Sequence, residues 1–142
     1  MSLTAANAVI MLSQATLFPV PQQIQEFAAD DVTDIDPARI LESMMGVDGV
    51  LSFGYVHTDR RQSITLQATS KSNRFFDTIA QQQQAAQDVY PLNGIIVLPA
   101  VKLKFIMTNG GLETYKVMPA VKKVLQARTY NIVWNRVDVA PA

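Results

Sequence analysis

Alternation of apolar and polar side chains constrains the fold of this 142-residue chain more than any other feature. The alternation is clear in residues 50–57 and again in residues 62–68, where every second side chain is apolar. A period of two is typical of β-strands that bury one face. The polar residues Thr58 to Arg61 separate the two segments, so we expect them to pair as a hairpin.

The same pattern predicts further strands. Residues 102–108 and 112–118 flank Asn109-Gly110, a dipeptide that favours a two-residue hairpin turn. Further strands are expected at residues 22–28, 38–45 and 128–137, while residues 3–12 are ambiguous between helix and strand.

One segment has the period of a helix instead. Between about residues 72 and 87, Phe75, Phe76 and Ile79 form an apolar stripe beside polar positions. Pro91 prevents the helix from continuing. We therefore expect one amphipathic helix near the middle of the chain.

The expected fold is mainly β, with seven to nine short strands and one helix in a single domain over residues 1–142. Hairpins favour antiparallel sheets closed as a sandwich or small barrel, with the helix covering one open end or side. The predicted core consists of Leu51, Phe53, Ile64, Leu66, Phe75, Phe76, Ile79, Phe105, Ile132 and Trp134.

Composition excludes several classes of protein. The chain is 49% hydrophobic and has 12 basic and 12 acidic residues, unlike a disordered chain or a strongly basic nucleic-acid binder. It has no cysteine, and its longest apolar stretch, residues 95–101, is too short to span a membrane. Residues 1–20 contain no Lys or Arg, so we expect neither a secretory signal nor a membrane anchor. The charged fraction of 17%, against about 25% in typical domains, fits a surface covered by other chains.

The balanced charge hides an asymmetry. Residues 1–59 contain eight acidic residues and one basic residue, whereas residues 60–142 contain eleven basic and four acidic residues. If the two halves form opposite surfaces, one copy could stack on the next by charge. The alternative is that both halves fold into one mixed surface.

The outward strand positions are mostly uncharged and polar. They suit either ordinary contact with solvent or a wet, confined space, and the sequence leaves both open. The residues singled out here are Gln23, Gln25, Ser63, Thr65 and Gln67.

The sequence shows no catalytic constellation. His57 is the single histidine, and no nearby serine lies in a nucleophile-elbow pattern. The acidic segment from Asp30 to Asp36 lacks the central glycine and the final glutamate of a calcium loop. We expect no catalytic residue, no cofactor and no metal.

Three segments resemble the tail tube proteins of contractile-tailed bacteriophages. Residues 45–50 form a glycine-rich turn before a strand, and residues 64–73 form a Leu- and Thr-rich strand that leads into a helix start. The similarity extends from about Phe18 to Val137, although the acidic segment is more charged than the family pattern. The closing strand has the family pattern at Arg128, Tyr130, Ile132 and Trp134.

The resemblance implies two antiparallel sheets rolled into a small β-barrel with a flanking helix. It also implies rings of six copies stacked into a hollow tube in the virion tail, with the sheets of neighbours joined around a bore that conducts DNA without specific binding. Tail sheath and baseplate proteins would be partners, and the type VI secretion tube protein is similar. Ser63, Thr65 and Gln67 would face the lumen. The candidate residues for ring stacking are Asp30, Asp31, Asp34, Asp36, Asp48, Lys122 and Lys123.

Other functions remain open at this point. A baseplate or tail-tip ring could share the fold, and so could a secretion-type tube protein. A small β-barrel enzyme that uses His57 is a further alternative from a different class.

Overall fold

The computed structural model describes residues 8–25, 27, 33–115, 118 and 121–142. In these residues it contains nine strands and one helix, and all strand pairs are antiparallel. The elements are β1 (Val9–Gln14), β2 (Phe18–Ile24), β3 (Thr33–Ile35), β4 (Leu41–Met45), β5 (Leu51–Tyr55), β6 (Arg60–Leu66), α1 (Asn73–Ala86), β7 (Leu92–Leu98), β8 (Leu103–Tyr115) and β9 (Arg128–Pro141).

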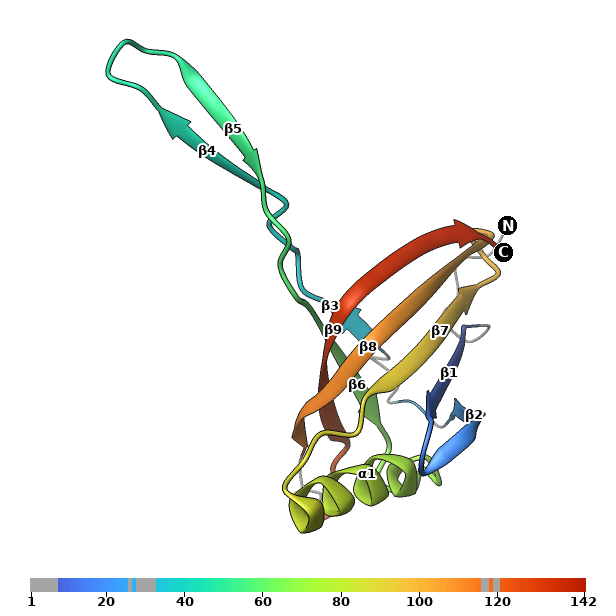
Figure 1. The fold of residues 1–142 in the computed structure, drawn as a ribbon. Coiled ribbons are helices and arrows are strands. Elements are labelled where there is room, and N and C mark those ends of the chain that lie inside the picture. The colour runs from blue at the N-terminus through green and yellow to red at the C-terminus, as the bar shows by residue number, and fades with distance from the viewer. Residues whose placement is uncertain (1–7, 26, 28–32, 116–117, 119–120) are drawn as a thin grey trace.

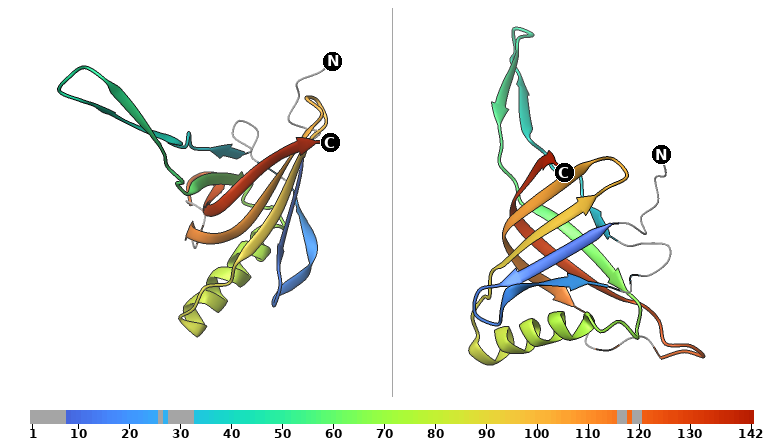
Figure 2. Two further views of the ribbon diagram at one scale, coloured as in Figure 1. Left: turned by 45° about the horizontal axis from the view of Figure 1, so that its top comes forward. Right: turned by 90° about the vertical axis from the view of Figure 1, so that its right-hand side faces the viewer.

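The strands form two sheets. Seven strands make one sheet in the order β2-β1-β7-β8-β9-β6-β3, and β4 pairs with β5 in a separate two-stranded sheet. The large sheet curls around its inner face, and α1 lies across one end of it (Figures 1 and 2). The predicted class of two antiparallel sheets with one helix is confirmed. The curled sheet is sandwich-like and does not close as a barrel, because β2 and β3 form its two edges.

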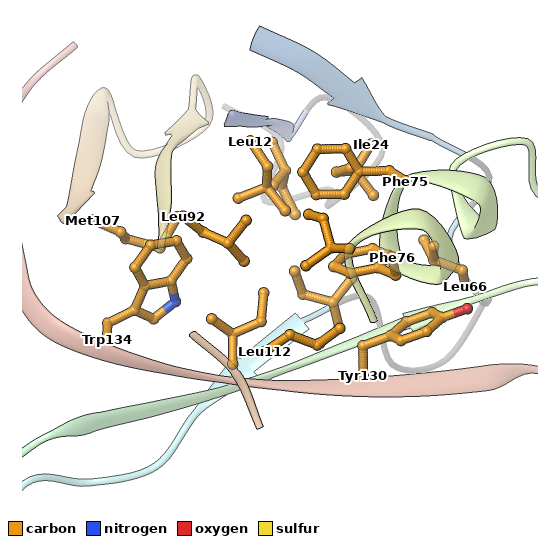
Figure 3. Packing of buried hydrophobic residues seen from close by; sticks show 14 of the residues in the cluster. Leu12, Ile24, Leu66, Phe75, Phe76, Leu92, Met107, Leu112, Tyr130 and Trp134 are labelled. Carbon is orange, nitrogen blue, oxygen red and sulfur yellow. The ribbon is translucent and has the colours of Figure 1, made fainter. Parts of the chain in front are cut away.

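The core fills the inner face of the large sheet (Figure 3). Alternate residues of β6 and β9 point inward and are buried, as the period of two requires. Trp134 is fully buried in this core, and its indole Nε1 donates a hydrogen bond of 2.8 Å to Gln62 Oε1. Of the predicted core residues, Phe105 is half-buried against this cluster, and Ile64, Leu66, Phe75, Phe76, Ile79, Ile132 and Trp134 are buried within it.

The helix packs on this core through its predicted apolar stripe. Phe76 stacks on Tyr130 of β9, with ring centroids 4.3 Å apart. Beside this stack, Arg128 Nη2 lies 2.6 Å from Asp77 Oδ1, and the Arg128 side chain is almost fully buried. This ion pair fixes α1 to the start of β9.

The two remaining predicted core residues are placed differently. Leu51 is 44% exposed and Phe53 is 64% exposed, so the prediction that they belong to the core is wrong for the single protomer. Both lie in β5, which pairs with β4 and not with β6, so the predicted hairpin of residues 50–57 with 62–68 is also wrong. Alternation identifies a strand with one apolar face, but it does not identify the partner strand or what covers that face.

The hairpin predicted from residues 102–108 and 112–118 is also wrong, because one continuous strand takes its place. Asn109 and Gly110 lie inside β8, a single strand from Leu103 to Tyr115. Asn93 of β7 faces two residues of β8, because the register shifts between the pairs Leu92↔Gly110 and Gly94↔Met107. Asn109 has a φ of 51° at this bulge. The positive φ that favours an Asn-Gly turn equally favours a bulge, so the dipeptide bends β8 and does not reverse it.

Several element boundaries shift from those predicted. The strand expected at residues 22–28 is β2, which starts at Phe18, and the one expected at residues 38–45 is β4. The strand expected at residues 128–137 extends to Pro141, and the ambiguous segment at residues 3–12 overlaps β1. The strands β3 and β7 are not predicted from the sequence. The helix predicted at about residues 72–87 is α1, with Ser72 and Gln87 as its caps.

Candidate functional site

The most exposed part of the described chain is a projecting hairpin, here called the arm (residues 40–56). It contains β4, β5 and the turn between them, and it extends away from the curled sheet (Figure 1). Gly49 in the turn has a φ of 83°, which a side chain would disfavour, and Gly46 N donates to Val50 O at 2.8 Å. The sequence therefore predicts this turn correctly.

The arm has one apolar face. Directly opposed residues of an antiparallel pair share a face, and the pairs here are Leu41↔Tyr55, Ser43↔Phe53 and Met45↔Leu51. The opposite face carries the pairs Glu42↔Gly54 and Met44↔Ser52. We call the first set the arm face, and all of its apolar members are exposed in the protomer: Leu41, Met45, Leu51, Phe53 and Tyr55.

The base of the arm is held by a few hydrogen bonds. Val56 N donates to Ile40 O at 3.1 Å, and Thr58 Oγ1 donates to Arg39 O at 3.1 Å. His57 lies at this joint, with Nε2 3.1 Å from the backbone oxygen of Asn135. His57 is therefore an exposed residue at the base of the arm. No group of three or more His, Cys, Asp or Glu residues that could hold a metal occurs in the described residues.

A second surface, here called the outer wall, is the outer face of β6, β9 and the end of β8. Thr65 Oγ1 lies 3.2 Å from Thr129 Oγ1 on the neighbouring strand. Asn131, which pairs with Ser63, donates from Nδ2 to Thr114 Oγ1 at 2.6 Å. The outer wall is therefore polar but uncharged at Ser63, Thr65, Thr114, Thr129 and Asn131.

The outer wall also carries one cluster of charges. Arg61 Nη1 lies 2.6 Å from Glu113 Oε1, and Arg61 Nη2 lies 3.3 Å from Asp59 Oδ2. The hydrogen bond that Arg61 donates to Glu113 and the negative charges of both acids raise the pKa of Arg61. This cationic group is thus compensated by adjacent carboxylates.

The five candidate lumen residues do not form one surface. Ser63 and Thr65 lie together on the outer wall, whereas Gln23 lies on β2, which four intervening strands separate from β6. Gln25 and Gln67 follow the ends of β2 and β6. Their carbonyl groups accept hydrogen bonds from Ser70 Oγ at 2.6 Å and Asn73 Nδ2 at 3.0 Å, so these two segments hold the helix start.

The candidate stacking residues are also spread over the molecule. Asp48 lies in the arm turn, where its Oδ1 accepts a hydrogen bond of 3.2 Å from Val50 N. Lys122 and Lys123 lie between the bridged residues Val121 and Leu125, in the connection from β8 to β9. The views place the arm and this connection at opposite ends of the molecule (Figures 1 and 2). Asp34 and Asp36 lie in and after β3, and Asp30 and Asp31 lie outside the described residues.

The sequence did not predict a third feature, a pocket on the inner face of the sheet away from α1. This mouth pocket has a volume of about 240 Å³ and is lined by Thr33, Asp34, Ile35, Gln62, Ile96, Leu98, Phe105, Met107 and Val137. The side-chain amide of Gln62 in this lining already has hydrogen-bond partners. Its Nε2 donates to Thr33 Oγ1 at 2.8 Å, and its Oε1 accepts from Trp134 Nε1. The pocket therefore presents mainly apolar surface.

The helix α1 has 14 residues and is too short to cross a membrane, and the described residues contain no other helix.

The fold is similar to chains of contractile injection systems. A chain from the PVC sheath/tube terminator in the extended state has a TM-score of 0.67 and 11% identity, with 99% of this chain and 97% of that chain covered. A chain from the PVC sheath-tube complex has a TM-score of 0.66 and 9% identity, with 99% and 93% covered. A chain from the anti-feeding prophage baseplate has a TM-score of 0.59 and 11% identity, with 99% and 98% covered. The expected likeness to contractile-tail proteins is therefore confirmed at the level of the fold.

Comparison with curated proteins gives no match. The sequence does match a family described as tail fiber protein gp32, over residues 1–138. Because this match spans nearly the whole length, the chain belongs to the tail fiber protein gp32 family.

Proposed function

We propose that this protein is a structural, non-enzymatic subunit of a phage tail tube. In this role, six copies form a ring, and rings stack into a hollow tube that conducts DNA within the virion tail. Tail sheath and baseplate proteins are its partners. The fold shared with chains of sheath-tube complexes supports this role, and so does a family whose description names a tail protein.

The uncovered arm face is the observation that carries the proposal. A two-stranded ribbon is at best marginally stable in water by itself. The arm exposes five large apolar side chains on one face, and a contiguous exposed apolar patch marks an interaction site. An arm of this kind is explained if other copies cover it in an assembly.

The outer wall suits the bore of such a tube. DNA is held mainly through contacts of Lys and Arg with its phosphates. The wall carries mainly hydroxyl and amide groups, and its Arg61 is paired with Glu113. A bore lined in this way lets DNA slide past without gripping it.

The experiment is to concentrate the purified protein and follow its assembly by light scattering and negative-stain electron microscopy. We expect rings or tubes from the wild type. A variant in which a short Gly-Ser linker replaces residues 41–55 should remain a folded monomer. If the wild type stays monomeric at high concentration, even with sheath and baseplate proteins present, the proposal is wrong.

A second candidate is a terminal ring of the same fold, at the end of a tube or in a baseplate. It is favoured by the similarity to chains from a tube terminator and a baseplate, which is about as high as the similarity to a sheath-tube chain. The same micrographs separate the two candidates. A tube subunit gives particles of increasing length, whereas a terminal ring gives single or paired rings at every concentration.

A further inference from the structure

We propose that the arm face docks into the mouth pocket of a second copy of this chain. This inference rests on the proposed function and names the contact through which the copies assemble. Each copy would then present one arm and receive another.

The arm supplies an apolar surface that needs a cover. Phe53 lies in the middle of the arm face, between the pairs Leu41↔Tyr55 and Met45↔Leu51. The arm strands pair with each other, and the described hydrogen bonds to the rest of the chain lie at the base of the arm. The protomer therefore leaves the arm face in water.

The mouth pocket has a matching surface. Leu98, Phe105 and Val137 line it, and Val139 continues the apolar surface outward with 62% of its area exposed. An engineered cavity of about 150 Å³ holds a benzene molecule. The pocket volume of about 240 Å³ therefore accommodates the phenyl ring of Phe53 and part of a second apolar side chain.

The course of the chain makes a second copy the occupant. Ile35 lines the pocket, and the chain leaves it through residues 36–40 to enter the arm, which points away from the sheet (Figure 1). The arm of the same protomer therefore does not cover its own pocket. The arm of another protomer brings an apolar face to the mainly apolar lining of the pocket.

Charges near the two surfaces favour the same contact. Glu42 and Asp48 are the only charged residues between positions 40 and 56. Lys102 and Lys104 lie at the end of the sheet that contains Leu98, because Lys104 pairs with Val97 and Leu103 pairs with Leu98. An acidic arm would thus approach an end of the sheet that carries two lysines, although Asp34 also lies on the pocket.

The contact has a consequence for assembly. Two different surfaces meet, so the interface is heterologous and repeats from one copy to the next. Such a contact closes into a ring or extends along an axis. Both results are compatible with a stacked tube.

The absence of cysteine in the sequence allows a direct test by disulfide cross-linking. One preparation carries Phe53→Cys and a second carries Leu98→Cys. The two are mixed, assembled and oxidised. A disulfide requires the two Cα atoms to lie within about 7 Å, so it reports contact between copies. We expect a disulfide-linked dimer as the main product of the mixture.

Val89→Cys serves as the matched control for Leu98→Cys, because Val89 is apolar and 64% exposed but lies just after α1. Mixing it with Phe53→Cys should give no dimer. If one of the first two variants fails to assemble, Tyr55→Cys and Val139→Cys provide a second pair on the same two surfaces.

The possible failures are distinguishable. Dimers from Phe53→Cys alone would indicate contact between arms and overturn the pocket assignment. Preferred cross-linking of Phe53→Cys to Val124→Cys would place the arm on the connection from β8 to β9, and it would also overturn the assignment. Assembly of the variants without a disulfide in either cysteine pair would also overturn the pocket assignment. In these three cases the proposed function stands, whereas a wild type that forms no particles contradicts the proposed function itself.

Discussion

At the scale of single residues, Gly110 shows how closely the core is packed. A Cβ atom at this position would overlap Cε3 and Cζ3 of Trp134, which is fully buried. Gly111 is adjacent in the same strand, and a Cβ atom there would meet no other atom within 4 Å. The two glycines therefore form a matched pair for mutation.

Gly110→Ala should lower the free energy of unfolding by about 1–3 kcal/mol, the usual cost of overpacking a core. Gly111→Ala should leave it nearly unchanged. Urea denaturation followed by Trp134 fluorescence measures both variants. Equal stability of the two variants would show that Trp134 is not seated against Gly110.

Tyr130 gives the protein a dependence on alkaline pH. Its hydroxyl donates to Asn73 Oδ1 at 2.8 Å, and its ring lies between Phe76 and the Arg128 guanidinium. Burial disfavours the tyrosinate anion and raises the pKa of Tyr130 above its ordinary value of 10.0, although the nearby Arg128 opposes this. The unfolded chain therefore loses this proton at lower pH than the folded chain.

The stability contributed by neutral Tyr130 is complete below pH ~10 and is lost as pH rises above it, by up to about 1.4 kcal/mol per pH unit. Tyr130→Phe removes this ionisation and should lose less stability over the same range, although it starts lower because Asn73 loses its donor. Denaturation curves of both proteins between about pH 8 and about pH 11 measure how the free energy of unfolding changes with pH. Parallel losses in both proteins would rule out the role of Tyr130.

At the scale of elements, the arm separates assembly from folding. Among the residues that the structure describes, its strands pair only with each other, so a change on the arm should alter contacts between copies and leave the protomer stable. The two faces of the arm differ in composition. This difference allows the arm face to be tested within one element.

Phe53→Glu places a charge on the arm face and should strongly impair assembly, because a contact that buries a Phe side chain gains about 1.5–3 kcal/mol. Met44→Glu is the control, since Met44 is even more exposed (75%) but lies on the opposite face. Light scattering measures assembly, and thermal melting should show that both protomers remain folded. If Met44→Glu impairs assembly as much as Phe53→Glu, the arm face is not the contact surface.

At the scale of the whole molecule, the unequal charge of the two halves of the sequence should steer copies toward each other. Glu42 and Asp48 are the charged residues of the arm, and Lys102 and Lys104 lie at the end of the sheet beside the mouth pocket. Electrostatic steering raises association rates and is screened by salt, with a Debye length of about 10 Å at 0.1 M.

The initial rate of assembly should therefore fall between about 20 mM and about 300 mM NaCl. Asp48→Asn retains an oxygen that can accept the hydrogen bond from Val50 N but removes the charge, so it should weaken this salt dependence. Asp48→Lys should weaken it further. Stopped-flow light scattering measures the rates, and an Asp48→Lys rate equal to wild type at low salt would exclude steering by the arm.

Across these scales, the sequence by itself determined the helix, the strands other than β1, β3 and β7, and part of the core. The period of two identifies strands, the stripe from Phe75 to Ile79 identifies α1, and Gly46 to Gly49 identifies the arm turn, because these are local preferences of the backbone and of side-chain spacing.

Only the tertiary structure decided which strands pair and which apolar faces are buried. Leu51 and Phe53 alternate in the same way as Ile64 and Leu66, yet the first pair lies on the arm and the second in the core. Asn109-Gly110 is compatible with a turn or a bulge. In the fold it forms a bulge, because β8 pairs with β7 on one side and with β9 on the other along this segment. Strand partners and the mouth pocket depend on contacts between distant segments, whose free energies are not encoded in any local pattern.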